Sequence, residues 1–489
     1  MKRTIPLILA LLMASQCFLT ACGNTEAEIE TETTPQQTFS ENSGSADSSE
    51  TIEETEPETE PSLYDTLQPK DYEGYTFRFF TEGSNYGITA MDAEEVNGEI
   101  INDTIYERNR YIEDQLNIVF SDTWADWMEP RDRLKIMVPA GSDDFDVMWY
   151  GVYLNSSLSS EHMINLYEIE DINWDDPWWE KDIRDIYEIK GKLFFTHTPM
   201  NLHYYESLVT PLFNKTIAEQ NQLDNLYDIV NEGKWTFDKM AEIAVSMIKD
   251  IDGNGKMERS KDLFGIAAST NLVAYMMVSG GCQVIGADET GYPQFLGLSE
   301  RFTSVVESMA KTFSVPDILI ENGDYIQQFQ NQHSLFFLDT LGRVKDFRSL
   351  DADFGILPLP KYDEAQEDYI SSIFNGALAM VVPSTCREGH NIGTILNYLS
   401  ALSYRDLIPA YYEKNIQGKQ MRDEDSVKML EIMLSNIRAD LSLIFEWCGM
   451  NNLILTSSKT NGTNLASKFK AMEKAMVVTI DRMYQGYTK

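Results

Sequence analysis

Short stretches of alternating apolar and polar residues occur along this chain, separated by longer stretches with an apolar residue at every third or fourth position. In the first alternating stretch Tyr75, Phe77 and Phe79 share one face, which predicts a β-strand ending at Phe80. The helix expected next has one apolar face, formed by Ile101, Ile105, Ile112 and Leu116. Strands at 116–120 and 145–150 follow, with a helix ending at 134–138 between them. This order is typical of a parallel sheet with helices on its faces.

The later part of the chain shows both patterns in a less regular order. A strand is expected at 191–195. A strong helix is expected after Trp235, with Thr236 as its N-cap and Phe237, Met240 and Ala244 on its buried face. The other expected elements are helices at 302–313 and 325–330, strands at 335–338, 354–357 and 377–382, and two late helices at 392–402 and 427–444.

The start of the chain has the pattern of an export signal. Lys2 and Arg3 precede an apolar run at 5–14 that is too short to span a bilayer, which predicts a secretory signal peptide. The following Leu-Thr-Ala-Cys sequence, ending at Cys22, resembles the bacterial lipoprotein box, in which the cysteine receives a diacylglycerol and the chain is cut before it. We therefore predict a signal peptide at 1–21 and a lipidated Cys22. An ordinary signal peptide with an incidental cysteine is the alternative.

Residues 22–65 differ in composition from everything that follows. Glu, Thr, Ser and Pro dominate this segment, and between 23 and 65 it contains no Lys or Arg. Such a segment buries too little apolar surface to offset its ordering entropy, and like charges keep it extended. It is expected to be a disordered acidic tether between the lipidated cysteine and the folded part.

Composition narrows the classes of function. The 489 residues carry a formal net charge of −39, and 43% are hydrophobic, which is enough for two or three domains with real cores. This acidity argues against nucleic acid and against adhesion to anionic lipid, so membrane attachment would depend on the lipid anchor alone. The three cysteines after the signal, Cys282, Cys386 and Cys448, form no CxxC pair. Isolated thiols are favoured over one disulfide.

One loop has the spacing of a calcium site. Oxygen-bearing side chains stand at its positions 1, 3, 5 and 9, with a glycine, Gly255, at position 6, and the carbonyl of the residue at position 7 could add a ligand. At position 12 Lys261 replaces the usual glutamate, and Asp262 could substitute for it. The predicted ligands of this structural Ca²⁺ are Asp250, Asp252, Asn254, Lys256, Glu258 and Asp262. A metal-free Asp/Gly turn is the alternative.

No catalytic motif is recognisable. The five histidines lie outside any HExxH sequence, no GxSxG elbow exists, and no glycine-rich phosphate loop follows a predicted strand. We therefore predict no catalytic residues, no catalytic cofactor and no enzymatic activity. A glycosidase remains an alternative, because its two carboxylates are placed by the fold and leave no local pattern.

Several short stretches resemble one protein family in their order and spacing. They are 98–103 (GEIIND), 107–109 (ERN), 144–147 (DFDV), 177–179 (PWW), 191–193 (GKL), 235–237 (WTF), 250–258 with 264–266 (FGI), 354–360 (FGILPLP), 411–412 (YY), 422–423 (RD) and Ser426. Together they resemble the extracellular solute-binding lipoproteins of ABC importers, in the class that includes maltose-binding protein. The resemblance implies a two-lobed α/β fold of the periplasmic-binding type (type II) with a ligand cleft between the lobes.

The resemblance also implies how the chain is divided. Lobe one would comprise 66–205 and 374–415, and lobe two 206–373 and 416–489. Ligands of open α/β sheets bind beyond the carboxyl ends of the strands, and hinge closure about a few residues traps them. The candidate ligand-binding residues are therefore those at strand ends and crossings: Glu82, Ser84, Trp124, Trp149, Tyr150, Tyr204, Tyr205, Glu206, Asp339, Arg343 and Asn375.

The function expected from these features is capture of a small solute, a sugar or oligosaccharide, and its delivery to the permease of an ABC importer. The protein would be a monomer on the outer face of the cytoplasmic membrane, held there by its lipid anchor. A surface-anchored enzyme acting on glycans, or a ligand sensor, is the alternative. Among the aromatic candidates, Trp149 is expected to be an exposed stacking platform for the sugar.

Overall fold

The computed structural model describes residues 63–83, 87–126, 133–321, 323–347, 350, 352–417 and 424–488. The predicted signal peptide, Cys22, Ser84 and nearly all of the tether lie outside the described residues. The chain divides into two compact units, Met1–Gln68 and Pro69–Lys489. The described part of the first unit is chiefly the short 3₁₀ helix η1 (Leu63–Thr66), within the last residues of the predicted tether.

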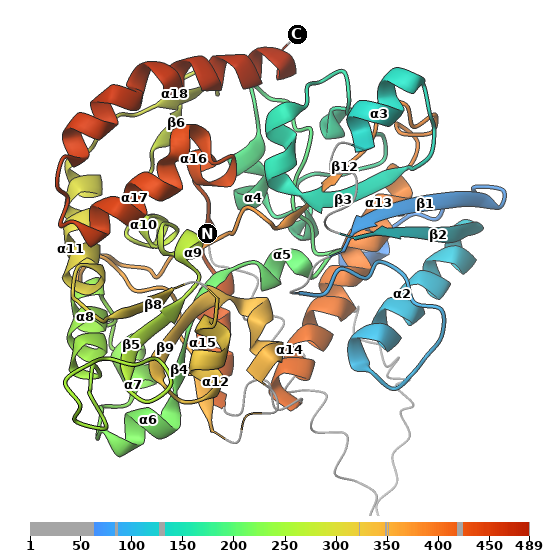
Figure 1. Ribbon diagram of the computed structural model, residues 1–489. Helices are drawn as coiled ribbons and strands as arrows, with labels where there is room; N and C mark the ends of the chain where they lie inside the picture. The colour runs from blue at the N-terminus through green and yellow to red at the C-terminus, as the bar shows by residue number, and fades with distance from the viewer. Residues whose placement is uncertain are drawn as a thin grey trace, which may run out of the picture. The chain divides into compact units, whose positions relative to one another are not determined.

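The first sheet contains the three strands predicted near the start of the fold. Its order is β12-β3-β1-β2; β1 is parallel to both β2 and β3, and β12 is antiparallel to β3 (Figure 1). Helix α2 (Ile100–Leu116) buries its predicted apolar face. We call this sheet and the elements around it lobe one. Its strands are β1 (Tyr75–Glu82), β2 (Ile118–Ala125), β3 (Val147–Gly151) and β12 (Leu378–Val381).

The second sheet has five strands in the order β10-β4-β9-β5-β8. β5 is parallel to its two neighbours, whereas β4 is antiparallel to β9 and β10. Helix α8 (Phe237–Ser246) begins at the predicted N-cap, since the Thr236 hydroxyl accepts a hydrogen bond from the Lys239 amide at 3.2 Å. We call this sheet and the elements around it lobe two. Its strands are β4 (Val209–Asn214), β5 (Phe264–Ala268), β8 (Leu319–Glu321), β9 (Ser334–Thr340) and β10 (Phe354–Ile356).

The remaining elements before residue 300 are mostly short. They are α3 (Arg133–Ala140), η2 (Val152–Ser157), η3 (Leu166–Glu168), η4 (Pro177–Trp179), α4 (Lys181–Tyr187), α5 (His203–Glu206), α6 (Lys215–Gln220), α7 (Leu226–Asn231), α9 (Thr270–Val273), α10 (Met276–Ser279), β6 (Ile285–Ala287) and β7 (Pro293–Phe295).

The elements after residue 300 include the longest helix of the chain's described part. They are α11 (Glu300–Phe313), α12 (Tyr325–Gln330), η5 (Leu341–Phe347), β11 (Ser371–Ser372), α13 (Gly393–Leu402), the π-helical turn η6 (Ser403–Leu407), α14 (Ile408–Gln417), α15 (Glu424–Leu434), β13 (Ile437–Arg438), α16 (Leu441–Ile444), η7 (Trp447–Gly449), α17 (Met450–Lys459) and α18 (Leu465–Tyr487). No helix among the described residues combines the length and apolar character needed to cross a membrane.

Two predicted elements are wrong. Residues 191–195 form no strand; the nearest pairings are the isolated bridges Ile189–Lys192 and Thr196–Met380, and Phe194 and Phe195 are both buried instead of alternating. The predicted helix 427–444 is interrupted, because β13 pairs with β11 and Asp440 then caps the separate helix α16. In both places tertiary packing overrides the local pattern.

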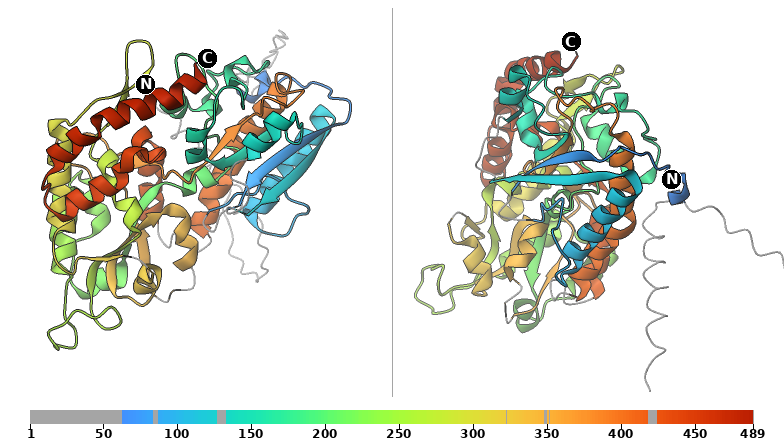
Figure 2. Two further views of the ribbon diagram at one scale, coloured as in Figure 1. Left: turned by 45° about the horizontal axis from the view of Figure 1, so that its top comes forward. Right: turned by 90° about the vertical axis from the view of Figure 1, so that its right-hand side faces the viewer.

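The C-terminal helix α18 reaches from lobe two to lobe one. Near its start Phe469 stacks on Phe295 of β7, with ring centroids 5.5 Å apart. At its end the Tyr487 hydroxyl donates to the Asn155 carbonyl at 2.7 Å, and the Ser160 amide donates to the Gly486 carbonyl at 3.0 Å. The helix is red in Figure 1, and Figure 2 shows it from two further directions. The sequence-based division places 416–489 in lobe two, yet the last turn of α18 is anchored in lobe one.

Candidate ligand-binding site

The carboxyl edge of the lobe-one sheet carries two aromatic rings, each lying across the end of a strand. A Cβ atom at Gly83, directly after β1, would clash with the indole of Trp124. A Cβ atom at Gly151, the last residue of β3, would lie 2.6 Å from the ring of Tyr153. Glycine at each strand end therefore lets a ring approach the backbone. Trp124 remains 60% exposed and Tyr153 is half-buried, so the two rings are accessible at this edge.

Polar groups surround these rings. The buried Glu82 carboxylate accepts a hydrogen bond from the Gly151 amide at 2.9 Å, which ties the ends of β1 and β3 together. The Asn375 carbonyl, just before β12, accepts from the Tyr153 amide at 3.4 Å. The Asn375 side-chain amide donates to the Glu446 carboxylate of lobe two at 3.1 Å. A few fixed polar groups beside apolar rings are typical of small-molecule sites.

The corresponding edge of lobe two carries a polar cluster at the end of β9. Tyr325 donates to the Asp339 carboxylate at 2.7 Å, and the Arg343 guanidinium lies 3.9 Å from Asp339 and 3.3 Å from Asp346. Burial raises the pKa of Asp339, although the hydrogen bond from Tyr325 opposes the shift. The predicted residues Asp339 and Arg343 therefore lie together, and this cluster holds the segment that follows β9.

The two carboxyl edges meet where a loop of lobe one reaches lobe two. The Ile88 amide donates to the Glu206 carboxylate, and a Cβ atom at Gly342 would lie 2.9 Å from the Gly87 nitrogen. Gly87 has φ +81°, a conformation that side chains rarely adopt. The predicted residue Glu206 is therefore a contact between the lobes at the crossing from α5 to β4.

The structure contradicts the prediction that Trp149 and Tyr150 are accessible. Trp149 is 0% exposed and packs against Phe79 with ring centroids 5.6 Å apart. Tyr150 is 5% exposed and donates its hydroxyl to Asn155 at 3.0 Å. The physical reason is packing around a central strand: β3 lies between β1 and β12, Phe79 packs against Trp149, and Asn155 and Met163 contact Tyr150.

Tyr204 and Tyr205 are also buried and are not accessible contact residues. Both hydroxyls donate to the Glu180 carboxylate, at 3.4 Å and 2.7 Å. The Tyr204 ring stacks on His197 with centroids 4.9 Å apart. These contacts hold α5 against lobe one at the crossing between the lobes. The two tyrosines are therefore buried packing residues of this crossing.

Sequence reasoning missed Tyr153 and Glu446. Tyr153 could have been found, because it closely follows a glycine, Gly151, at the end of a predicted strand. Trp124 differs, since it lies on β2 and reaches Gly83 at the end of the neighbouring strand β1. Glu446 has no local signal, since it lies just beyond the last predicted helix and reaches Asn375 only through the tertiary fold.

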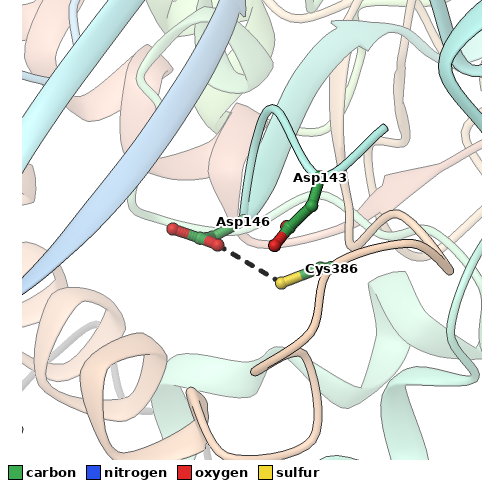
Figure 3. A group of neighbouring side chains, drawn as sticks. All are labelled: Asp143, Asp146 and Cys386. Atoms are coloured by element: carbon green, nitrogen blue, oxygen red, sulfur yellow. Dashed lines mark hydrogen bonds between the residues drawn. The ribbon is translucent and has the colours of Figure 1, made fainter. Parts of the chain in front are cut away.

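A second group of acidic side chains lies at the opposite, amino edge of the lobe-one sheet (Figure 3). Asp143, Asp146 and Cys386 place their side-chain ligand atoms within 4.8 Å of one another, which is a spacing that metals also use. The Arg78 guanidinium, however, lies 2.6 Å from Asp146 and 2.9 Å from Asp143. Tyr75 donates to Asp146 as well, at 2.8 Å.

This cluster has the chemistry of a structural ion pair. Burial and the neighbouring Asp146 raise the pKa of the Cys386 thiol, which therefore stays protonated and donates to Asp146 at 3.3 Å. A metal would need the thiolate and free carboxylates, whereas Arg78 already compensates their charge. The cluster joins β1 to the segments before β3 and after β12. The three cysteines described are free thiols, as predicted.

The predicted calcium loop brings acidic groups together. Carboxylate oxygens of Asp250, Asp252 and Asp262 lie within 4.8 Å of one another. Asp250 accepts hydrogen bonds from the amides of Gly253 at 2.8 Å and Gly255 at 2.7 Å. These hard oxygen donors fit Ca²⁺ chemically, with Asp262 near the position where the usual glutamate is missing.

A lysine also lies in this loop. The Lys261 ammonium is 3.5 Å from Asp252 and 2.5 Å from Glu258, and its hydrogen bond lowers the pKa of Glu258. Lys261 thus compensates part of the acidic charge. Any cation bound here would compete with this lysine for the carboxylates of Asp252 and Glu258.

Comparisons with known proteins show which solved structures share this architecture. No known family matches the sequence, and no curated protein matches it either. Solved structures do match over most of the chain. The chain has the fold of the ABC solute-binding proteins. One match is an ABC substrate-binding protein from Listeria monocytogenes in complex with cycloalternan, with a TM-score of 0.52 and 11% sequence identity. The alignment spans 85% of this chain and 100% of the Listeria protein.

Two further solute-binding structures agree. UgpB from Mycobacterium tuberculosis, in complex with glycerophosphocholine, matches with a TM-score of 0.54 and 12% identity over 84% of this chain and 99% of its own. A cyclo/maltodextrin-binding protein complexed with maltotetraose matches with a TM-score of 0.52 and 13% identity over 84% and 96%. These are binding proteins with two lobes, so the predicted fold class, an α/β fold of the type II binding class, is confirmed.

Proposed function

We propose that this protein captures a neutral sugar or oligosaccharide between its lobes and delivers it to an ABC importer. The observation that carries the proposal is the pair of accessible rings, Trp124 over Gly83 and Tyr153 over Gly151, at the carboxyl edge of the lobe-one sheet. Flat apolar rings suit the C–H faces of sugars, and the nearby carboxylates and amides suit their hydroxyls. The binding-protein fold supports the same conclusion.

Replacing Trp124 by alanine tests this proposal. A neutral panel of maltotetraose, cellotetraose, xylotetraose, mannotetraose and chitotetraose is first screened by thermal shift, since a ligand that binds only the native state raises its stability. Trp124→Ala should then weaken binding of the best ligand about tenfold or more, because stacking on a ring is worth on the order of 1 kcal/mol beyond the lost area. Titration calorimetry measures the affinity.

Tyr111→Ala is the matched control, since Tyr111 is 49% exposed on α2. It should leave affinity unchanged, and both variants should keep their melting temperatures within a few degrees. An unchanged affinity in folded Trp124→Ala protein would remove Trp124 from the site. Chromatography of the same incubations separates binding from the alternative activity, because sugar cleavage products would identify an enzyme.

We also propose that the protein is lipid-anchored through Cys22 on the outer face of the cytoplasmic membrane. The proposal is supported by the short apolar run, the Leu-Thr-Ala-Cys sequence and the acidic segment that follows. Cys22→Ser should release the protein from the membrane, because each buried CH₂ of an acyl chain contributes about 0.8 kcal/mol to retention. Membrane fractionation measures the change, and Cys17→Ser is the control. A Cys22→Ser protein that remains lipid-modified on the membrane would contradict the anchor.

Finally, we propose that the Asp250 loop binds a structural Ca²⁺. Calcium should raise the melting temperature of the wild-type protein, because a ligand bound only to the folded state stabilises it. Asp250→Ala combined with Asp252→Ala should abolish this response without unfolding the protein. Calorimetry with calcium and with chelator measures both. An equal calcium response in wild type and double variant would rule out this loop as the site.

A further inference from the structure

An exposed carboxylate of lobe two is held on a strained stretch of backbone. Glu446 has φ +51° and Cys448 has φ +54°, so two side-chain-bearing residues occupy the left-handed region that favours glycine. Their neighbours explain why. Phe445 and Trp447 are both buried and pack together with ring centroids 5.3 Å apart, which leaves Glu446 between them directed outward and exposed.

The Glu446 carboxylate is tied to the ligand-binding edge of lobe one through a single residue. Asn375 donates from its side chain to Glu446 at 3.1 Å. The Asn375 carbonyl accepts from the Tyr153 amide at 3.4 Å, and its own amide donates to the Tyr275 hydroxyl at 3.2 Å. Asn375 is 6% exposed and has three fixed partners, so it connects Glu446 to the backbone of Tyr153.

The carboxylate keeps acceptor capacity beyond this contact. One oxygen accepts from Asn375, and the other has no hydrogen-bond partner among the described residues. A carboxylate has about four lone-pair sites, so an exposed one with a single partner can accept further hydrogen bonds from a ligand. The packing of Phe445 and Trp447 maintains the positive φ of Glu446 and so fixes the direction of its carboxylate.

We propose that Glu446 is the lobe-two acceptor for a hydroxyl or amino group of a sugar that lies on Tyr153, and that it excludes acidic sugars. This inference rests on the proposed function. Glu82 already places one carboxylate at the same edge, so a ligand anion would face two negative groups. Arg343, at the carboxyl edge of the lobe-two sheet, is engaged by Asp339 and Asp346.

The test compares three variants with the wild-type protein, using whichever member of the neutral tetrasaccharide panel raises its melting temperature. Glu446→Gln retains an oxygen for Asn375 and turns the second oxygen into a donor. It should weaken binding at least tenfold, because hydrogen bonds to charged groups are among the stronger ones. Glu446→Gly should also weaken binding at least tenfold, yet it should melt no lower than wild type, since glycine relieves the positive φ.

Cys448→Gly is the matched control. It relieves the same kind of strain two residues away, where the thiol contacts Thr479 and not Asn375, so its affinity should equal that of wild type. Tetragalacturonate is the acidic probe. Glu446→Gln should narrow the preference for the neutral sugar over tetragalacturonate by tenfold or more, because one of the two negative groups is removed.

The outcomes separate this inference from the proposed function. If no member of the panel changes the melting temperature of wild type, neutral oligosaccharide capture fails and the role of Glu446 fails with it. If wild type binds and Glu446→Gln binds the neutral sugar with equal affinity and equal preference over tetragalacturonate, the function stands and Glu446 is not the acceptor. Loss of affinity in Cys448→Gly equal to that in Glu446→Gly would likewise overturn the assignment, because backbone strain alone would then govern binding.

Discussion

Replacing Trp149 by alanine is expected to lower the free energy of unfolding by about 3–5 kcal/mol, the usual cost of removing a large buried side chain. Trp149 is 0% exposed on β3, paired through its backbone with Thr81 of β1 and Met380 of β12, and its ring contacts Phe79. Truncation leaves a cavity within the core of lobe one that neighbouring side chains cannot fill completely. Urea denaturation of wild type and variant measures the difference.

Trp124→Ala is the matched control for this prediction, because the same residue type is removed from the accessible end of β2. It should change the free energy of unfolding much less than Trp149→Ala. The folded fraction of Trp149→Ala should bind ligand with an affinity close to that of wild type. A stable Trp149→Ala protein with strongly weakened binding would contradict the core role of Trp149 and identify it as a ligand contact.

Asp146→Ala should be comparably destabilising, by about 3–5 kcal/mol, the typical cost of removing one partner of a buried ion pair. Asp146 is 0% exposed and accepts hydrogen bonds from Arg78 and Tyr75. It also accepts from the Cys386 thiol (Figure 3). Its removal takes the shared acceptor away from Tyr75 and Cys386 and leaves Asp143 as the remaining carboxylate beside Arg78. Thermal and urea unfolding measure the effect.

Asp185→Ala is the control for the ion pair. Asp185 pairs with Lys181 at 2.6 Å on the exposed surface of α4, where such pairs contribute about 0–1 kcal/mol. A loss below about 1 kcal/mol for Asp146→Ala as well would contradict the structural role of the cluster. It would then be reasonable to test the cluster of Asp143, Asp146 and Cys386 for metal binding.

Much of the fold follows from local pattern. The alternation at Tyr75, Phe77 and Phe79 predicts β1, and the apolar face of α2 is buried as expected, because a helix or strand with one apolar face is stable only when that face is covered. Thr236 marks the start of α8 for an equally local reason, since its hydroxyl satisfies an amide of the first turn. The place of Trp124, at the carboxyl end of a strand, is also readable from sequence.

Strand order and long-range pairing were decided only in three dimensions. Trp124 and Trp149 both stand at or near strand ends, yet β2 is the edge of its sheet and β3 is covered on both sides, so one ring is accessible and the other is core. The interruption of the helix at 427–444 likewise depends on β11, far away in the chain. Local periodicity describes which face of an element is apolar. It does not determine which neighbour covers that face, nor that Glu446 meets Asn375. Both depend on contacts between distant segments that only the tertiary fold brings together.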